Sequence, residues 1–267
     1  MAQIITKIEA QKRKGRFNVY VDGQYAFPVS EDVFVKYRLF KGMELNQALI
    51  ETLKDADRLS KLHAKALNYL AHQLRTEFEV RSKLQEFTED EGAIDQVISQ
   101  LKAQQLLNDQ KYAGSYVRTV VRQKKNGPNW IRQKLLAKKV PKNLIEAALT
   151  DFFPEEQVIQ NGRLVAQKQL RHYRNDSQKM MINKTKQLLI RRGFDSEMVT
   201  EIMAQIKVGN PTQHDEAIIQ EVATKYWRKY RRLESYQQIQ KTKQALFRKG
   251  FLMDDIESAL AKLKEIN

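Results

Sequence analysis

Lysine and arginine are the residues of this sequence whose number and spacing suit a chemical task, the binding of a phosphate backbone. The chain of 267 residues has 47 Lys and Arg against 32 Asp and Glu, which gives a formal net charge of +15. Three blocks, at 118–142, 163–192 and 225–249, have nine basic residues each, and their only acidic residues are Asp176 and Glu234. A positive charge of this size predicts an anionic polymer or an acidic protein surface as partner.

Seventeen residues of these blocks are candidate contacts to nucleic acid or to a protein partner. Sixteen are cations, and Trp130, in a basic turn, is a candidate for stacking on exposed bases. Solvated helix faces that maintain solubility are the alternative interpretation, and nothing in the pattern supports base-specific recognition. The recurrence of the blocks in phase favours contact with phosphates. The candidates are Arg118, Arg122, Lys124, Lys125, Trp130, Arg132, Lys134, Arg171, Arg174, Lys186, Arg191, Arg192, Arg228, Arg231, Lys243, Arg248 and Lys249.

Residues that could form an active site or a metal centre are not apparent. The four histidines share no ligand spacing, no glycine-rich phosphate loop occurs, and the chain has no cysteine. Asp55 and Asp57 are close in sequence, but two residues apart on a helix they do not face each other. We therefore predict a protein without catalytic residues, cofactor or metal. A nucleic-acid enzyme with unrecognised carboxylates stays open as an alternative.

The elements that must position the cations are helices of a repeated unit. The stretch Lys186–Met203 returns nearly verbatim as Lys243–Leu260, and a weaker copy covers Arg132–Leu149. Each copy predicts a helix that ends at a left-handed residue and is followed by a second helix. Two copies have glycine at this position, whereas the weaker copy has Lys139, so we expect its cap to be strained or different.

An apolar stripe with helical spacing follows in each copy and occurs a fourth time upstream. The stripes begin at Ile94, Ile145, Val199 and Ile256, and the helices before them carry leucines in register at Leu84, Leu135, Leu189 and Leu246. We therefore predict a mainly α-helical protein with four tandem repeats of three helices, named repeat one to repeat four. Their predicted ranges are 46–105, 106–153, 154–209 and 210–267.

Residues 1–45 have a different pattern, which predicts a small N-terminal β module. Three short segments alternate in hydrophobicity, and Asp22-Gly23 between the last two is a hairpin signal. A three-stranded meander is expected, followed by a short helix that Ser30 caps and that ends at Lys41-Gly42. The expected strands are 4–10, 16–21 and 25–28.

The sequence carries no signal for a membrane or for export. No stretch approaches the roughly 18 apolar residues of a membrane span, and the N-terminus lacks a signal-peptide core. The lack of cysteine is compatible with a reducing compartment. We expect a cytoplasmic, monomeric protein without membrane contact.

Two phrases of the sequence resemble signatures of the RecX regulators of the RecA recombinase. The first is Leu-Leu-Asn-Asp-Gln-Lys-Tyr-Ala at 106–113, followed by Tyr-Val-Arg at 116–118. The second is Asn-Gly-Pro-Asn-Trp-Ile-Arg-Gln-Lys-Leu at 126–135, in the expected order and spacing. The N-terminal hairpin is similar to the extension of long family members. The resemblance thus covers nearly the whole chain, and Lys139, where the family usually has glycine, is a local departure.

The resemblance implies three-helix repeats in an elongated, curved array. It also implies a non-enzymatic protein that binds RecA filaments and single- and double-stranded DNA. Family membership would predict inhibition of the recombinase ATPase, of strand exchange and of the coprotease function. The basic blocks by themselves are equally compatible with a second hypothesis, an autonomous DNA-binding or architectural protein without sequence specificity.

Overall fold

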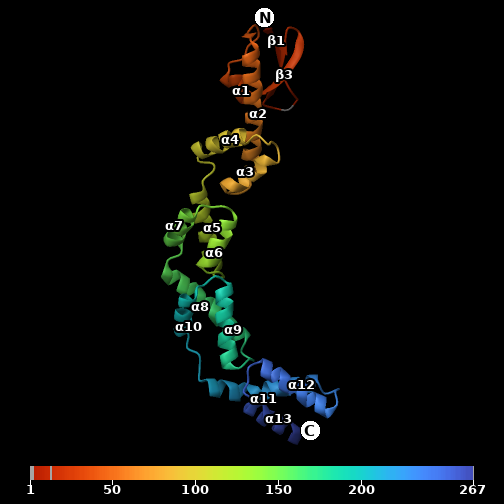
Figure 1. The fold of residues 1–267 in the computed structure, drawn as a ribbon, viewed down its shortest axis with the longest axis vertical. Helices are drawn as coiled ribbons and strands as arrows, with labels where there is room; N and C mark the ends of the chain where they lie inside the picture. The colour runs from red at the N-terminus through yellow and green to blue at the C-terminus, as the bar shows by residue number, and fades with distance from the viewer. Residues whose placement is uncertain (1–2, 13, 267) are drawn as a thin grey trace. The chain divides into compact units, whose positions relative to one another are not determined.

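The structure is a computed structural model that describes residues 3–12 and 14–266. The chain forms two compact units. Unit 1 comprises Met1–Tyr112 and Lys138–Pro141, and unit 2 comprises Ala113–Ala137 and Lys142–Asn267. Within the described residues the chain forms thirteen helices and four strands (Figure 1).

Unit 1 begins with a small antiparallel sheet whose strand order is β3-β2-β1-β4. Its strands are β1 (Gln3–Ala10), β2 (Arg16–Val21), β3 (Gln24–Ser30) and β4 (Glu44–Leu45). Asp22 and Gly23 form the turn between β2 and β3 with φ angles of 51° and 86°, as a two-residue hairpin with the native strand twist requires. The predicted meander is present, and β4 is an additional strand that pairs with β1.

The helix after the sheet is shorter than predicted. α1 (Glu31–Lys36) begins at its N-cap Ser30, as expected. Arg38 then takes a left-handed conformation with φ 47° and stops the helix, so the predicted end at residues 41–42 is wrong. Gly42 belongs to the approach to β4, where its N–H donates to the carbonyl of Ile5 at 2.8 Å.

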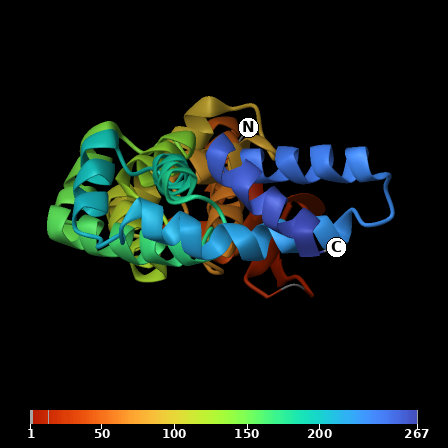
Figure 2. The same cartoon turned by 90° about the horizontal axis from the view of Figure 1, so that it is seen from below.

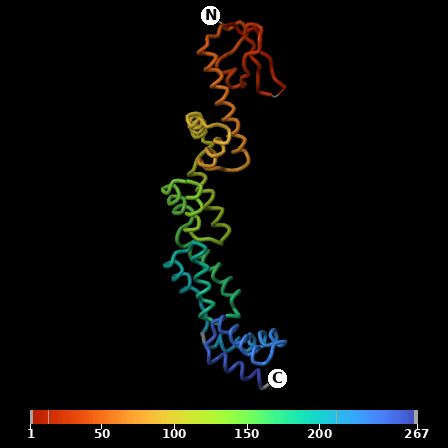
Figure 3. The backbone as a smooth tube through the Cα atoms, turned by 45° about the vertical axis from the view of Figure 1, so that its right-hand side comes forward, coloured from red at the N-terminus to blue at the C-terminus, as the bar shows by residue number. Residues whose placement is uncertain are grey.

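The sheet packs against the first half of α2 (Gln47–Leu70), as the tube in Figure 3 shows. The buried core between them consists of Ile5, Val19, Val21, Phe27, Val29, Val33, Leu39, Leu45, Ile50 and Leu53. Asp57 adds a buried polar tie, because its Oδ1 accepts from the N–H of Ser30 at 2.8 Å. Its two oxygens also pair with the guanidinium of Arg16 at 3.1 and 2.9 Å. These bonds fix the sheet to the helix.

Repeat one combines the second half of α2 with α3 (Glu77–Gln85) and α4 (Glu91–Ala103). Thr76 and Glu79 form the capping box at the start of α3, and Asp90 caps α4. The apolar stripe of α4 and the leucine of α3 meet in one buried cluster. Its members are Leu62, Ala66, Val80, Leu84, Ala93, Ile94, Val97, Ile98, Leu101 and Leu107.

Repeats two to four supply the remaining nine helices among the described residues. They are α5 (Asp109–Gln123), α6 (Pro128–Ala137), α7 (Lys142–Phe152), α8 (Glu155–His172), α9 (Gln178–Arg191), α10 (Ser196–Ala204), α11 (Pro211–Lys229), α12 (Ser235–Arg248) and α13 (Met253–Ile266). Figure 2 shows the last three packed on one another. The register leucines at 84, 135, 189 and 246 are all fully buried, which confirms the mainly helical fold of three-helix repeats. The boundaries at residues 45, 105, 153 and 209 stay a prediction.

The second helix of repeats two, three and four ends in a left-handed residue. Gly193 and Gly250 have φ angles of 86° and 89°, and Lys139 has 58°. After Gly193 the N–H of Phe194 donates to the carbonyl of Leu189 at 3.1 Å, which closes a Schellman motif. Lys139 therefore makes the same left-handed turn with a side chain, at a cost of about 1–2 kcal/mol.

Candidate nucleic-acid interface

The second helices α3, α6, α9 and α12 each carry a cation three residues before the register leucine. We call this residue the helix-two cation. Its four members are Arg81, Arg132, Lys186 and Lys243, and the last three are candidate contacts. The groups that each cation faces decide whether it is available to a phosphate.

In three repeats the helix-two cation is paired with a carboxylate on the third helix of its own repeat, fourteen residues later. The pairs are Arg81 with Asp95 at 2.6 Å, Arg132 with Glu146 at 2.8 Å and Lys243 with Glu257 at 2.6 Å. The hydrogen bond from Arg132 lowers the pKa of Glu146, and the one from Lys243 lowers the pKa of Glu257. Both carboxylates are thus ionised at neutral pH and compete with any phosphate for these cations.

Repeat three lacks this pair. Thr200 occupies the position fourteen residues after Lys186, and its hydroxyl donates to the carbonyl of Ser196 in its own helix at 2.9 Å. Lys186 is exposed and makes no ion pair with another described residue. Its charge is therefore uncompensated within the part of the chain that the structure describes.

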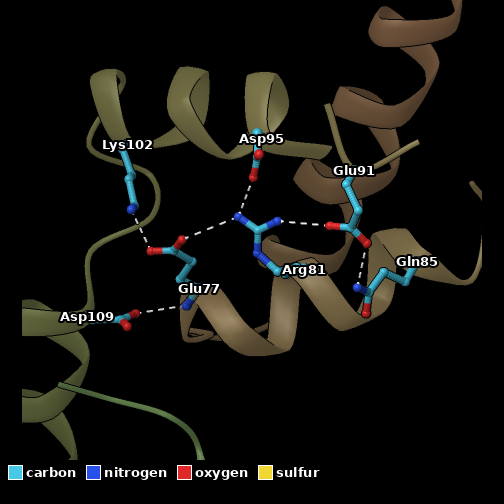
Figure 4. A network of polar contacts seen from close by, with 7 residues as sticks. All are labelled: Glu77, Arg81, Gln85, Glu91, Asp95, Lys102 and Asp109. Carbon is cyan, nitrogen blue, oxygen red and sulfur yellow. Dashed lines mark hydrogen bonds and ion pairs between the residues drawn. The ribbon is translucent and has the colours of Figure 1, made fainter. Parts of the chain in front are cut away.

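Repeat one contributes no candidate contact, and Figure 4 shows two of its cations, Arg81 and Lys102, among carboxylates. Arg81 pairs with Asp95 and also lies 3.7 Å from a carboxylate oxygen of Glu77 and 3.3 Å from one of Glu91. Lys102 reaches the other oxygen of Glu77 at 2.5 Å. The hydrogen bond to Asp95 raises the pKa of Arg81. This network of opposite charges gives repeat one no surplus positive charge.

A second set of cations joins neighbouring repeats. We call these the clasp cations: Lys138, Arg192 and Lys249, three residues after the register leucines of repeats two to four. Their side chains bond to Glu79, Asn126 and Asp176 of the preceding repeat at 2.5, 3.4 and 2.5 Å. Lys138 follows α6 in sequence but lies, like Glu79, in unit 1. Arg192 and Lys249 are candidate contacts, and the structure places both in junctions between repeats.

The backbone reinforces each clasp at the start of a second helix. The carbonyls of Lys138, Arg192 and Lys249 accept hydrogen bonds from Thr76 Oγ1, Gly127 N and Ser177 N at 3.2, 2.7 and 2.9 Å. At α6 and α9 the donor is the backbone N–H of the residue before the helix, whereas at α3 it is the hydroxyl of the N-cap Thr76, whose own N–H is bonded to Glu79. One junction design therefore recurs three times.

Asp176 is the most enclosed acceptor among the clasps. Lys184 and Lys249 approach its two oxygens at 2.7 and 2.5 Å, and its side chain is only 5% exposed. Burial raises the pKa of Asp176, but the hydrogen bonds from both lysines outweigh burial and hold the pKa below its ordinary value. This lone acidic residue of the second basic block is therefore a structural anchor.

Trp130 is half-buried at the junction of repeats two and three. A Cβ added to Gly193 would lie 2.2 Å from the backbone nitrogen of Trp130, so the two backbones are in close contact. The ammonium of Lys134 lies 5.4 Å from the centroid of the indole. Trp130 thus packs between repeats and leaves only part of its ring for contact with a base.

The other candidates remain at the surface. Arg118 stacks its guanidinium on Phe152 at 4.4 Å, and Arg171 donates to the carbonyl of Gln167 in its own helix. The rest are exposed and have no ion pair among the side chains that the structure describes. They are Arg122, Lys124, Lys125, Lys134, Arg174, Lys186, Arg191, Arg228, Arg231 and Arg248, which we call the free cations. All ten belong to unit 2.

Sequence reasoning missed that the basic blocks contain cations with two different roles. A signal was present, because a basic residue is followed by an acidic one fourteen positions later in repeats one, two and four. The clasp cations had a weaker signal, their constant offset from the register leucine. Counting positive charges alone could not separate either set from the free cations.

Neither a metal centre nor a membrane-spanning helix is found among the described residues. Among residues 3–12 and 14–266, no group of three or more His, Asp and Glu side chains is placed to hold a metal ion. None of the helices that the structure describes is both long and apolar enough to cross a bilayer.

Models of four RecX domains match successive parts of the chain. The N-terminal domain of regulatory protein RecX matches residues 3–46, and the first three-helix domain matches 63–101. The second three-helix domain matches 108–149. The third matches twice, at 155–203 and 214–260, which agrees with the strong internal similarity of repeats three and four.

Similar proteins and structures point the same way. Regulatory protein RecX of Levilactobacillus brevis is 44% identical over 262 residues, 98% of each chain, and that of Limosilactobacillus reuteri is 40% identical over 96% of this chain and 97% of its own. A crystal structure of regulatory protein RecX matches 76% of this chain and all of its own with a TM-score of 0.69 and 40% identity. Another, of RecX from Lactobacillus salivarius, matches 56% and 97% with a TM-score of 0.54. The chain belongs to the RecX family of regulatory proteins.

Proposed function

We propose that this protein is a non-enzymatic regulator of the RecA recombinase that binds RecA filaments together with DNA. The free cations of unit 2 would contact the phosphate backbone, and the protein would inhibit ATP hydrolysis, strand exchange and coprotease activity of the filament. Such a regulator would act as a monomer in the cytoplasm. The observation that carries the DNA part of the proposal is the set of ten exposed cations without carboxylate partners.

The physical reason is counterion release. DNA holds a layer of condensed cations, and a lysine or arginine that replaces one of them releases it into solution. Arg132, Lys243 and Lys249 already have carboxylates as partners, so they would release little. The free cations have no such partner and would account for the affinity.

The first experiment measures DNA binding over a salt series with a labelled oligonucleotide. If about six to eight free cations meet phosphates, the logarithm of the binding constant should fall against the logarithm of salt with a slope of about −5 to −7. Replacing Lys124, Lys125 and Lys134 together by alanine should make that negative slope shallower by about 3. The matched control replaces Lys36, Lys41 and Lys54, three exposed lysines of unit 1, and should leave the slope unchanged.

The second experiment tests regulation. DNA-dependent ATP hydrolysis by RecA should fall when the protein is added at substoichiometric to equimolar amounts, and the triple variant should inhibit less. Unchanged ATPase and strand exchange at low salt would overturn the proposal. DNA binding that persists without any effect on RecA would instead support the autonomous DNA-binding protein.

A further inference from the structure

The four helix-two cations occupy one structural position, and one of them differs from the others. In repeats one, two and four the third helix supplies a carboxylate within 2.8 Å of the cation. In repeat three the same place holds Thr200, whose hydroxyl is already bonded within its own helix. The position therefore presents a neutral pair in three repeats and a single positive charge at Lys186.

A carboxylate at this distance does what a phosphate would do. It neutralises the cation and replaces the counterions that DNA binding would otherwise exploit, so the paired residues Arg132 and Lys243 have little electrostatic gain from contacting a phosphate. Lys186 keeps its full charge, its mobile side chain and its exposure to solvent. Only repeat three can thus offer its helix-two cation without first breaking an ion pair.

The surroundings of Lys186 strengthen this difference. Lys179 lies seven residues earlier in α9 and therefore on the same helical face, and it too is exposed and without an ion pair among the described residues. The equivalent position is the uncharged Tyr236 in α12, and in repeat two it is Lys125, which lies before the start of α6. The neighbouring Lys184 pairs with Asp176, the acceptor of the clasp cation Lys249. The face of α9 thus presents two exposed cations without ion pairs among the described residues, Lys179 and the free cation Lys186, about two helical turns apart.

We propose that Lys186 on the outer face of α9 contacts the phosphate backbone of DNA, whereas the helix-two cations of α6 and α12, Arg132 and Lys243, are neutralised by carboxylates of their own repeats. The ligand is the phosphodiester backbone of DNA, recognised by charge rather than by sequence. This inference rests on the proposed DNA binding and decides which of the helix-two cations takes part in it.

The test compares two lysines at the same position. When the logarithm of affinity is plotted against the logarithm of salt, K186A should make the negative slope shallower by about 0.9. It should also weaken binding about fivefold near 0.1 M salt. K243A, the matched control, should leave the slope and the affinity unchanged within error. Thermal unfolding followed by circular dichroism would verify that both variants stay folded, as expected for exposed side chains.

A second variant tests the cause. T200E places a carboxylate where repeats two and four have one, and it should weaken DNA binding as much as K186A does. In a K186A background T200E should have no further effect, which separates pairing with Lys186 from general repulsion of DNA. E257Q, which frees Lys243, should make the negative slope steeper by up to about 0.9.

Equal losses for K186A and K243A, or additive effects of K186A and T200E, would overturn the assignment to Lys186. A wild-type protein whose DNA binding is absent or insensitive to salt would instead overturn the proposed function itself. The two failures are therefore distinguishable in one set of titrations.

Discussion

Repeat one and repeat three are built on the same three-helix plan but differ in charge. In repeat one Arg81 faces three carboxylates, and Lys83 is paired with Glu86 at 2.6 Å. In repeat three the corresponding helix presents Lys179 and Lys186 to solvent without partners among the described residues. The apolar register is the same, so the packing of a repeat does not depend on its surface charge. A single substitution on this scaffold is therefore enough to expose a positive charge, as Thr200 does where the other repeats have a carboxylate.

The two second helices also end differently. Both have a right-handed C-cap, Glu86 with φ −67° and Arg192 with φ −81°, but only α9 is followed by a left-handed residue, Gly193 with φ 86°, which lies against the backbone of Trp130. The left-handed ending occurs after α6, α9 and α12, and each of these helix ends bonds to the start of a preceding second helix. The glycine therefore belongs to the junction between repeats and not to the three-helix unit as such.

The largest expected effect is a loss of stability in Gly193→Ala. The added Cβ would meet backbone at 2.2 Å, and the positive φ is unfavourable for alanine, so we expect destabilisation of about 3 kcal/mol. Gly42→Ala is the control, because Gly42 has a φ of 95° but no atom within 4 Å of an added Cβ, and it should cost only about 1 kcal/mol. Urea unfolding measures both, and equal losses would show that close contact with Trp130 is unimportant.

Much of this architecture was predictable from local patterns. The leucine register, the glycine closures and the capping box at Thr76 follow from residues a few positions apart, and all three are present in the structure. β4 escaped prediction because a two-residue strand has no periodicity of its own and is defined by its pairing with β1. The early end of α1 escaped as well, since Arg38 rather than glycine makes the left-handed turn.

The candidate site was predictable in its composition but not in its availability. The sequence identifies the basic blocks, yet whether Arg132 is free depends on how the third helix docks on the second and brings Glu146 within 2.8 Å. In the same way, the role of Lys249 depends on the packing of repeat four against Asp176 in repeat three. Such contacts are tertiary, and they cannot be inferred by counting charges along the chain.

The next smaller loss of stability is expected on removing a carboxylate, and it should differ between Asp176 in repeat three and Asp95 in repeat one. Asp176→Asn leaves two lysines without a counter-charge at an enclosed site, and we expect a loss of about 2 kcal/mol at pH 7. Asp95→Asn, in the exposed network of repeat one, should cost less than about 1 kcal/mol. Chemical denaturation of the two variants measures the difference. Equal losses would mean that enclosure adds nothing to the clasp.

The effect of Asp176 should also depend on pH in one direction. Because its pKa in the folded protein lies below the ordinary 3.8, the ionised form stabilises the fold. That contribution is complete above the ordinary pKa and is lost as the pH falls through the lower folded pKa. The stability difference between wild type and Asp176→Asn should therefore be constant near neutrality and shrink below about pH 4.

The smallest effect has the opposite sign and concerns the one junction without glycine. Lys139 has a φ of 58°, is exposed and has no ion pair among the described residues. Replacing it by glycine relieves a left-handed conformation worth about 1–2 kcal/mol and adds flexibility to the unfolded chain worth about 0.5–1 kcal/mol, so Lys139→Gly should stabilise by about 0.5–1 kcal/mol. Lys139→Ala keeps the strain while removing the charged side chain, and it should leave stability nearly unchanged. A shift of a few degrees in melting temperature for glycine alone would show that the first junction uses the same closure as the other two, under strain. Stabilisation by both substitutions would instead attribute the cost to the lysine charge.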